Sequence, residues 1–138
     1  MLRVRLPEGA TFWIAPGGGL QPGETSEQAL RRELDEELGL PRLDLGPVIW
    51  RRDHDLTWQG RRFRQSESYF VAHVPRFQPV MRDANEAANL MEFRWWPQDA
   101  LRATPEALTP ARTASIIADY LQDGPPPEPG HEHITDPA

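Results

Sequence analysis

One stretch, Gly18 to Leu40, constrains this chain more than any other part of its sequence. Five residues separate Gly18 from Glu24, and seven more separate Glu24 from Arg32. From Arg32 the sequence reads RELDEELGL, in which charged and apolar residues keep a fixed order. A glycine-rich turn or an acidic helix is common on its own. Together, in this register, they predict a turn that leads into a helix carrying a dense group of carboxylates.

Residues 26–38 are predicted to form this helix. Thr25 is a suitable N-cap residue, and Gln28 lies three positions later as its partner in a capping box. Gly39 followed by Leu40-Pro41 predicts the end of the helix, because Gly tolerates the left-handed conformation and Pro cannot continue a helix.

Two neighbouring faces of the predicted helix differ in character. The apolar face repeats leucine at i, i+4 and i+8, which is typical of a helix packed on a core. Its residues are Leu30, Leu34 and Leu38. The acidic face carries carboxylates at i, i+3 and i+4, which repel one another unless a positive charge lies nearby. Its residues are Glu33, Glu36 and Glu37.

A divalent cation would suit this acidic face. Hard divalent cations take oxygen ligands, and Mg²⁺ commonly binds a few carboxylates together with substrate phosphates. Arg32 lies one turn before Glu36 and can orient a carboxylate by charge-assisted hydrogen bonds. The run 17–19 is all glycine, so its backbone can approach a site closely. The alternative is a solvated acidic helix, but the turn, Glu24 and Gly39 in the same register favour a site.

The segment resembles the Nudix box, G-x5-E-x7-R-E-U-x-E-E-x-G-U with U apolar, and matches it at every specified position. The preceding Trp13-x-x-Pro16-Gly17-Gly18 also resembles the usual lead-in of that family. The resemblance implies an α/β fold, the Nudix-type α/β/α sandwich around a mixed β-sheet. It also implies hydrolysis of a nucleoside diphosphate linked to another group, with Mg²⁺ or Mn²⁺ as cofactor.

The same resemblance implies roles for individual residues. The metal ligands would be the Gly17 carbonyl with the carboxylates of Glu33, Glu36 and Glu37. Glu33 would add a ligand or act as general base, and Arg32 would orient Glu33 or Glu36. Glu24 would brace the loop or bind metal through water.

The family often has a further catalytic acid outside the box, in a loop near the site. Glu86 is favoured because it lies in the loop-like stretch DANEAANL. Glu92 and Asp83 are the alternatives, and a solvated loop acid remains open for Glu86.

An arginine-rich segment that follows the box is the candidate region for substrate binding. Arginine side chains can hold phosphates, and aromatic rings can stack on a base. The candidate substrate-binding residues are Arg51, Arg52, Arg64, Trp58 and Gly18. The alternative is that the arginines form the solvated face of a hairpin and the aromatic residues belong to the core.

Sequence markers of several narrower Nudix groups are not found: those of NADH-cleaving, dinucleoside polyphosphate, ADP-ribose and coenzyme A enzymes. By elimination we expect a small-molecule substrate, a nucleoside triphosphate in canonical or oxidised form. Hydrolysis of ADP-ribose, a nucleotide sugar or a dinucleoside polyphosphate stays open. So does a nucleotide-sensing module without turnover, although such modules usually have damaged boxes and all three carboxylates are intact here.

The rest of the chain predicts one domain over residues 1–123 and a Pro-rich, disordered tail over 124–138. Strands are expected at 2–6, 12–14, 44–52, 68–74 and 92–96, with 68–74 central, and helices at 97–101 and 110–121. Residues 58–61 read as a hairpin turn.

The N-terminus predicts that the usual first strand of the family is missing or shortened. Either the true start lies upstream, or a partner in a homodimer supplies the edge. No apolar run reaches membrane-spanning length and no signal peptide is visible, so we expect no membrane partner and a cytoplasmic location. The net charge of −6 argues against binding bulk nucleic acid.

Overall fold

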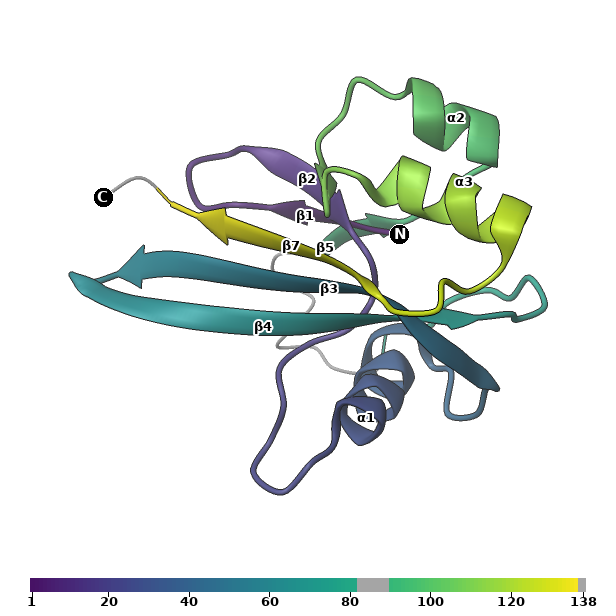
Figure 1. The fold of residues 1–138 in the computed structure, drawn as a ribbon, viewed down its shortest axis with the longest axis horizontal. Coiled ribbons are helices and arrows are strands. Elements are labelled where there is room, and N and C mark those ends of the chain that lie inside the picture. The colour runs from purple at the N-terminus through teal and green to yellow at the C-terminus, as the bar shows by residue number, and fades with distance from the viewer. Residues whose placement is uncertain (82–89, 137–138) are drawn as a thin grey trace. The chain divides into compact units, whose positions relative to one another are not determined.

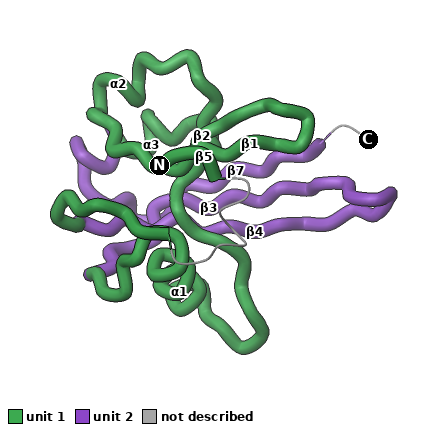
Figure 2. The backbone as a smooth tube through the Cα atoms, turned by 180° about the vertical axis from the view of Figure 1, so that it is seen from behind, with its two compact units in different colours: residues 1–43, 74–117 green, residues 44–73, 118–138 purple. Residues whose placement is uncertain are grey.

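The computed structural model describes residues 1–81 and 90–136, and these residues form two compact units (Figures 1 and 2). Unit 1 holds residues 1–43 and 74–117, and unit 2 holds residues 44–73 and 118–138. Each unit contains one mixed β-sheet, so the predicted α/β class is confirmed. The architecture is consistent with the Nudix-type fold that the resemblance implies, although the described strands form two mixed sheets instead of one.

The sheet of unit 1 has four short strands in the order β5-β1-β2-β6. Its strands are β1 (Leu2–Arg5), β2 (Thr11–Ile14), β5 (Leu90–Phe93) and β6 (Leu108–Thr109). β1 is antiparallel to both β2 and β5, whereas β2 and β6 run parallel. The strand predicted at 92–96 corresponds to β5, which begins two residues earlier and ends three residues earlier than expected.

Helix α1 (Ser26–Leu38) begins and ends where the sequence predicts. Both hydrogen bonds of the Thr25–Gln28 capping box form, and Gly39 at the C-terminus has the left-handed conformation, with φ 66°. The leucine face meets the sheet of unit 1, because Leu34 and Leu38 share a buried cluster with Leu2 of β1. These caps and this cluster hold α1 in one position within unit 1.

Aromatic side chains complete the packing of unit 1. Trp13 of β2 is fully buried and meets Trp96 edge to face, with ring centroids 5.1 Å apart. Trp95 packs in the same edge-to-face manner against Phe77 at 5.3 Å and Phe93 at 5.5 Å. Trp95 and Trp96 therefore both pack against other aromatic side chains of unit 1. The remaining helices are α2 (Gln98–Ala103) and α3 (Thr113–Asp123).

The sheet of unit 2 is a long hairpin with one added strand, in the order β4-β3-β7. Its strands are β3 (Leu45–Trp58), β4 (Arg61–Ala72) and β7 (Gly130–Thr135). The predicted hairpin turn is present, with positive φ at Gln59 and Gly60. The expectation that residues 68–74 form the central strand is wrong, because β3 lies between β4 and β7.

Strand β7 also corrects the prediction of a disordered tail. Residues Gly130–Thr135 pair in parallel with Trp50–Asp55 of β3. The Pro-rich composition of 125–129 hid this strand, although HEHIT alternates in side-chain character as a strand does. The boundary of the first domain at residue 123 stays a prediction.

Candidate active site

Arg32 lies at the centre of a network of carboxylates in unit 1. Its guanidinium donates two nearly parallel hydrogen bonds to Glu24, from Nε at 2.9 Å and from Nη2 at 3.0 Å. Nη1 donates to Glu33 at 2.8 Å and to Glu36 at 3.3 Å. Nη2 also donates to the carbonyl oxygen of Gly19 at 2.9 Å. One planar cation thus ties the glycine turn to three carboxylates, which a lysine ammonium could not do in this geometry.

The turn and the helix meet at Gly18 and Glu33. A Cβ placed on Gly18 would lie 2.5 Å from Oε1 of Glu33, so any larger residue would displace that carboxylate. Glu33 is itself 5 % exposed, as is Glu37 one turn later. Two carboxylates on one helix are therefore largely withdrawn from water. That arrangement is costly unless positive groups lie close to them.

The network also sets the charge of its outer members. The two hydrogen bonds from Arg32 and one from the backbone N–H of Gln21 hold the pKa of Glu24 below its ordinary value. The same carboxylates raise the pKa of Arg32, first through Glu24 and then through Glu33. Both groups stay charged across the physiological range, so the brace between turn and helix persists at neutral pH.

The donor set of α1 fits a hard divalent cation. Glu33, Glu36 and Glu37 offer only carboxylate oxygens, which Mg²⁺ and Mn²⁺ prefer. Within the described ranges, no three acidic or histidine side chains converge as a ready metal cage. Arg32 supplies the nearest positive charge to Glu33 and Glu36 instead. These three carboxylates are the residues of α1 that would hold a cation.

A cavity of about 190 Å³ lies next to the acidic face, also within unit 1. Its polar lining comes from Glu37 and Glu92, and the apolar lining includes Leu2, Met81, Leu90 and Phe93. Glu92 is engaged with Arg3 at 3.3 Å and with Arg94 at 3.3 Å. The carboxylate of Glu92 is thus paired with two arginines while it lines the cavity. Glu86, the favoured extra acid, and Asp83 lie outside the described residues.

The structure divides the candidate substrate-binding cluster between two faces of unit 2. Neighbouring residues of a strand point to opposite faces, so Arg52 and Trp58 lie on one face and Arg51 on the other. Arg64 pairs across the hairpin with Asp55, which places it on the face of Arg51. These residues therefore do not form one subsite, and Gly18 belongs to unit 1.

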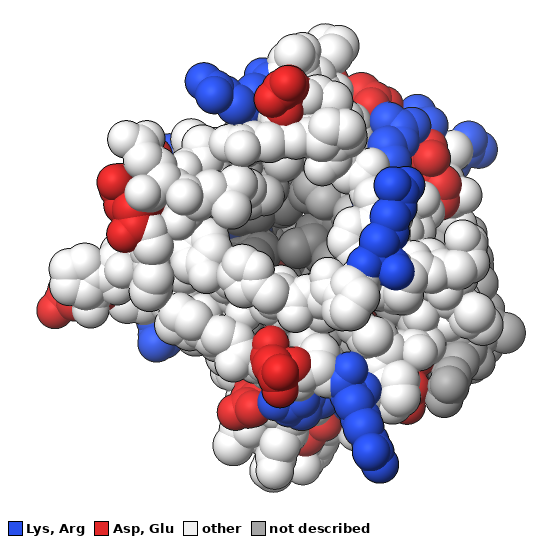
Figure 3. Space-filling view, turned by 90° about the vertical axis from the view of Figure 1, so that its right-hand side faces the viewer, with Lys and Arg blue, Asp and Glu red and all other residues white. Residues whose placement is uncertain are grey.

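Two of these arginines are already bound to acids. Arg52 is 8 % exposed and contacts Glu67 at 3.3 Å and Glu132 at 3.7 Å. Arg64 donates to both carboxylate oxygens of Asp55, at 2.7 and 3.1 Å. Acidic and basic side chains lie beside each other in several places on the face drawn in Figure 3. Trp58, in contrast, is 64 % exposed, so the alternative that placed the aromatics in the core is wrong for it.

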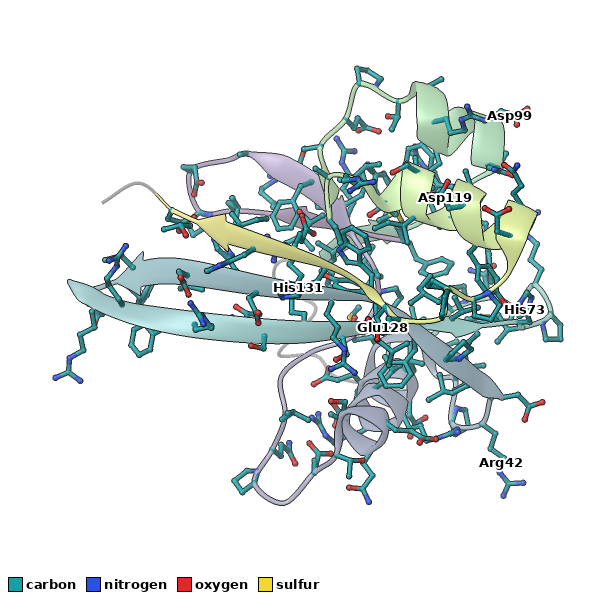
Figure 4. All side chains as sticks on the ribbon, viewed as in Figure 1. Arg42, His73, Asp99, Asp119, Glu128 and His131 are labelled. Atoms are coloured by element: carbon teal, nitrogen blue, oxygen red, sulfur yellow. The ribbon has the colours of Figure 1, made fainter. Side chains whose placement is uncertain are left out.

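Sequence reasoning missed a row of histidine–aspartate pairs across β3 and β7. His131, which is labelled in Figure 4, lies 2.8 Å from Asp53, and His133 lies 2.7 Å from Asp55. Strand alternation places both pairs on one face of the sheet. His54 lies 2.7 Å from Asp136 on the other face. The alternation of DHD at 53–55 and HEH at 131–133 is the signal that could have found them.

Comparison with known proteins agrees with this geometry. A family model described as the NUDIX domain matches residues 3–120. A Mycobacterium tuberculosis protein named "Putative 8-oxo-dGTP diphosphatase 2" is 38% identical over 102 residues, which cover 70% of each chain. An RNA pyrophosphohydrolase of Erythrobacter litoralis is 34% identical over 104 residues, 64% of this chain and 61% of the relative. Nucleoside triphosphatase NudI of an Enterobacter species is 58% identical over 36 residues, 26% of this chain and 25% of that protein.

In the described part of the chain, no helix combines the length and the apolar character that crossing a membrane requires.

Proposed function

The chain belongs to the Nudix family of hydrolases, and from that premise we propose that it cleaves a phosphoanhydride bond of a nucleoside triphosphate with a divalent cation. The observation that carries the proposal is the arrangement around Arg32. One guanidinium holds Glu24, Glu33 and Glu36 against the glycine turn. Three acids around one base leave a surplus of negative charge, which a cation and its bound phosphates would balance.

In the proposed mechanism, Glu36 and Glu37 would hold the cation, with the carbonyl oxygen of Gly17 as a further ligand. A bound divalent cation neutralises phosphate charge and lowers the pKa of a water molecule. Glu33 accepts the proton of the attacking water, a step worth about 10²–10⁴-fold in rate. Arg32 keeps the Glu33 carboxylate in place through the 2.8 Å hydrogen bond. Glu24 fixes Arg32 in turn.

The relatives support a triphosphate over the other substrates that the sequence left open. Their names contain 8-oxo-dGTP, RNA and nucleoside triphosphate. Neither ADP-ribose nor a nucleotide sugar is named among these three. We therefore propose a nucleoside triphosphate, canonical or oxidised, as the substrate, with Mg²⁺ or Mn²⁺ as the cation because carboxylate, carbonyl and phosphate oxygens form the donor set.

The test is product release from a substrate panel, measured with Mg²⁺, with Mn²⁺ and with EDTA. The panel contains dGTP, 8-oxo-dGTP, the other nucleoside triphosphates, ADP-ribose, a nucleotide sugar, a dinucleoside polyphosphate and a short RNA with a 5′-triphosphate. We expect metal-dependent release of pyrophosphate or phosphate from a triphosphate, with no release in EDTA. Turnover confined to ADP-ribose or a nucleotide sugar would overturn the proposed substrate. A folded protein that turns over none of the panel would overturn the hydrolase itself.

A further inference from the structure

We propose that the end of the β3–β4 hairpin, residues 56–64, is a binding surface for a single-stranded polynucleotide. We call this segment the hairpin tip. It is a two-stranded ribbon, because the pairing of β7 with β3 ends at Asp55. Figure 1 shows the hairpin continuing beyond the end of that pairing. The binding described here involves no bond cleavage, so it goes beyond the proposed function and does not depend on it.

The tip exposes two aromatic rings on the same face. Trp58 is 64 % exposed and Phe63 is 48 % exposed. Phe63 lies opposite Leu56 in the ladder, and Leu56 and Trp58 are two residues apart on β3, so the three side chains share a face. Diagonal neighbours on a hairpin lie about 7–8 Å apart, within reach of aromatic side chains. The tip thus offers two adjacent flat surfaces to the solvent.

The charge of the tip is opposite to that of the whole chain. Residues 56–64 contain three arginines and no acidic residue, in a protein with a net charge of −6. Arg64 is neutralised by Asp55, as described above. Arg61 and Arg62 form no ion pair with any residue in the described ranges. At ordinary salt the Debye length is about 10 Å, so a phosphate at the tip senses mainly these local charges.

The two aromatic rings, with Arg61 and Arg62 beside them, suit the successive nucleotides of a single strand. Each base can stack on one ring regardless of its identity, and the arginines can bind the phosphates between bases. Arg61 lies directly opposite Trp58, so it shares the aromatic face, whereas Arg62 pairs with Thr57 and points to the other face. The expected ligand therefore runs along the Trp58–Phe63 face and places a phosphate at Arg61.

A second copy of the chain is a weaker match for this surface. A buried aromatic residue contributes about 150–250 Å², so two of them provide at most about 500 Å². A stable interface buries about 800 Å² on each partner. The acidic surface of a second copy would be attracted to the basic tip. The apolar area is nevertheless too small for a lasting dimer through the tip alone.

The experiment measures binding of fluorescently labelled RNA and DNA octamers by anisotropy at 50 mM and 200 mM salt. The octamers carry 5′-hydroxyl ends, so they contain no phosphoanhydride and the readout is independent of turnover. We expect saturable binding of at least one octamer. Trp58→Ala and Phe63→Ala should each weaken it by about 5- to 150-fold, the range measured for losing one stacked base. Both side chains are exposed, and circular dichroism verifies that the variants fold.

Arg61→Gln and Arg62→Gln form a matched pair, because each removes one positive charge from the tip. Arg61→Gln should weaken binding more and lower the slope of log affinity against log salt by about 0.7. Arg42→Gln removes one positive charge at an exposed arginine outside the hairpin, so it should leave affinity unchanged.

Three results would overturn the inference. The first is that neither octamer binds at 50 mM salt. The second is binding that Trp58→Ala and Phe63→Ala leave unchanged. The third is self-association in sedimentation that Trp58→Ala abolishes, since the occupant would then be a second copy. Octamer binding without turnover of any triphosphate would leave this inference standing while the proposed function failed.

Discussion

The two charged networks of this molecule are balanced in opposite ways. Among the described residues of unit 1, Arg32 pairs with Glu24, Glu33 and Glu36, which is one base for three acids. In unit 2, the ion pairs around β3 and β7 join five basic side chains to five acids. Each imidazole there has its own carboxylate partner. Surplus negative charge is what a cation site requires, whereas a balanced set of pairs is sufficient to align strands.

The difference also separates the two arginine environments. Arg32 contacts groups from the turn and from its own helix, so its removal would affect the geometry of the whole site. Arg52 on β3 contacts acids of both β4 and β7, and Arg64 on β4 contacts an acid of β3, so their removal would affect strand pairing within unit 2. We therefore expect substitutions in the Arg32 network to change catalysis and substitutions in β3 and β7 to change local stability.

The largest effect should come from Glu37→Gln, which keeps the shape of the side chain and removes its charge. Loss of a metal ligand should lower kcat/KM by about 10³-fold, since a metal ion supplies several kcal/mol of transition-state stabilisation. Steady-state kinetics on the preferred triphosphate would measure it. Glu27→Gln, in an exposed pair on the same helix, is the control and should keep normal activity. Normal activity in Glu37→Gln would contradict the comparison, because the negative charge of unit 1 would then not be needed to bind a catalytic cation.

Arg32→Lys tests the centre of the network next. It keeps the charge but loses the planar fork that contacts Glu24 with two nitrogens. Partners that orient metal ligands typically contribute about 10–100-fold, so kcat/KM should fall within that range. Arg31→Lys is the matched control, because Arg31 pairs with exposed Glu27. Equal kinetics for the two variants would contradict the central role of Arg32.

The loss of thermal stability caused by Arg32→Lys should depend on pH. Arg32 lowers the pKa of Glu24, so this pair stabilises the fold above the ordinary pKa of Glu and ceases to do so as pH falls through the lowered value. Arg32→Lys should therefore lower Tm at pH 7 and have a smaller effect below about pH 4. Thermal unfolding at both pH values measures the difference. A Tm loss that grows on acidification would refute this account.

Gly18→Ala should have an intermediate effect. Its Cβ would come 2.5 Å from the Glu33 carboxylate, and the end of a side chain can move aside. We expect Tm to change little and kcat/KM to fall about tenfold, since a displacement near 1 Å can cost as much as 10²-fold. Gly19→Ala meets no atom within 4 Å and is the control. Equal activities for the two alanine variants would show that the position of Glu33 is not critical.

The smallest effect is expected at β7. Hydrogen bonds from Ser66 and His131 lower the pKa of Asp53, and those from Arg64 and His133 lower that of Asp55. These carboxylates therefore stabilise the pairing of β7 with β3 above the ordinary pKa of Asp, and less so as pH falls below it. In the Asp53→Asn/Asp55→Asn variant, amide hydrogens of β7 should exchange several-fold faster at pH 6, with a smaller difference on acidification. Asp119→Asn in α3 is the control, and in this variant the amide hydrogens of β7 should exchange at the normal rate.

Sequence reasoning predicted α1 completely because its determinants are local. The capping box, the leucine repeat and Gly39 all lie within one segment, so no distant contact is needed to specify it. The close approach of Gly18 to Glu33 also follows from a motif with fixed spacing. The hydrogen bonds of Arg32 to Glu33 and Glu36 were expected for the same reason.

Strand pairing was less accessible, because its determinants are far apart in the chain. The predicted strand at 44–52 continues to residue 58, and the one at 68–74 begins at residue 61. Most side chains of these extensions are charged or polar, and Trp58 and Phe63 among them are exposed, so hydrophobicity did not reveal them. Alternation along a strand could nevertheless have separated Arg51 from Arg52. The partner of β7 could not be read from composition, since the pairing joins residues about 80 positions apart.

Gly130 gives β7 a single position along β3. A side chain at this residue would collide with the indole ring of Trp50, which also donates to Glu132 at 3.0 Å. Sliding β7 by two residues would bring Glu132 over that ring, and sliding by one would exchange the faces of every histidine. The absence of a side chain at Gly130 therefore fixes the register of β7 on β3. The charged pairs can form, and stabilise the strand, only in that register.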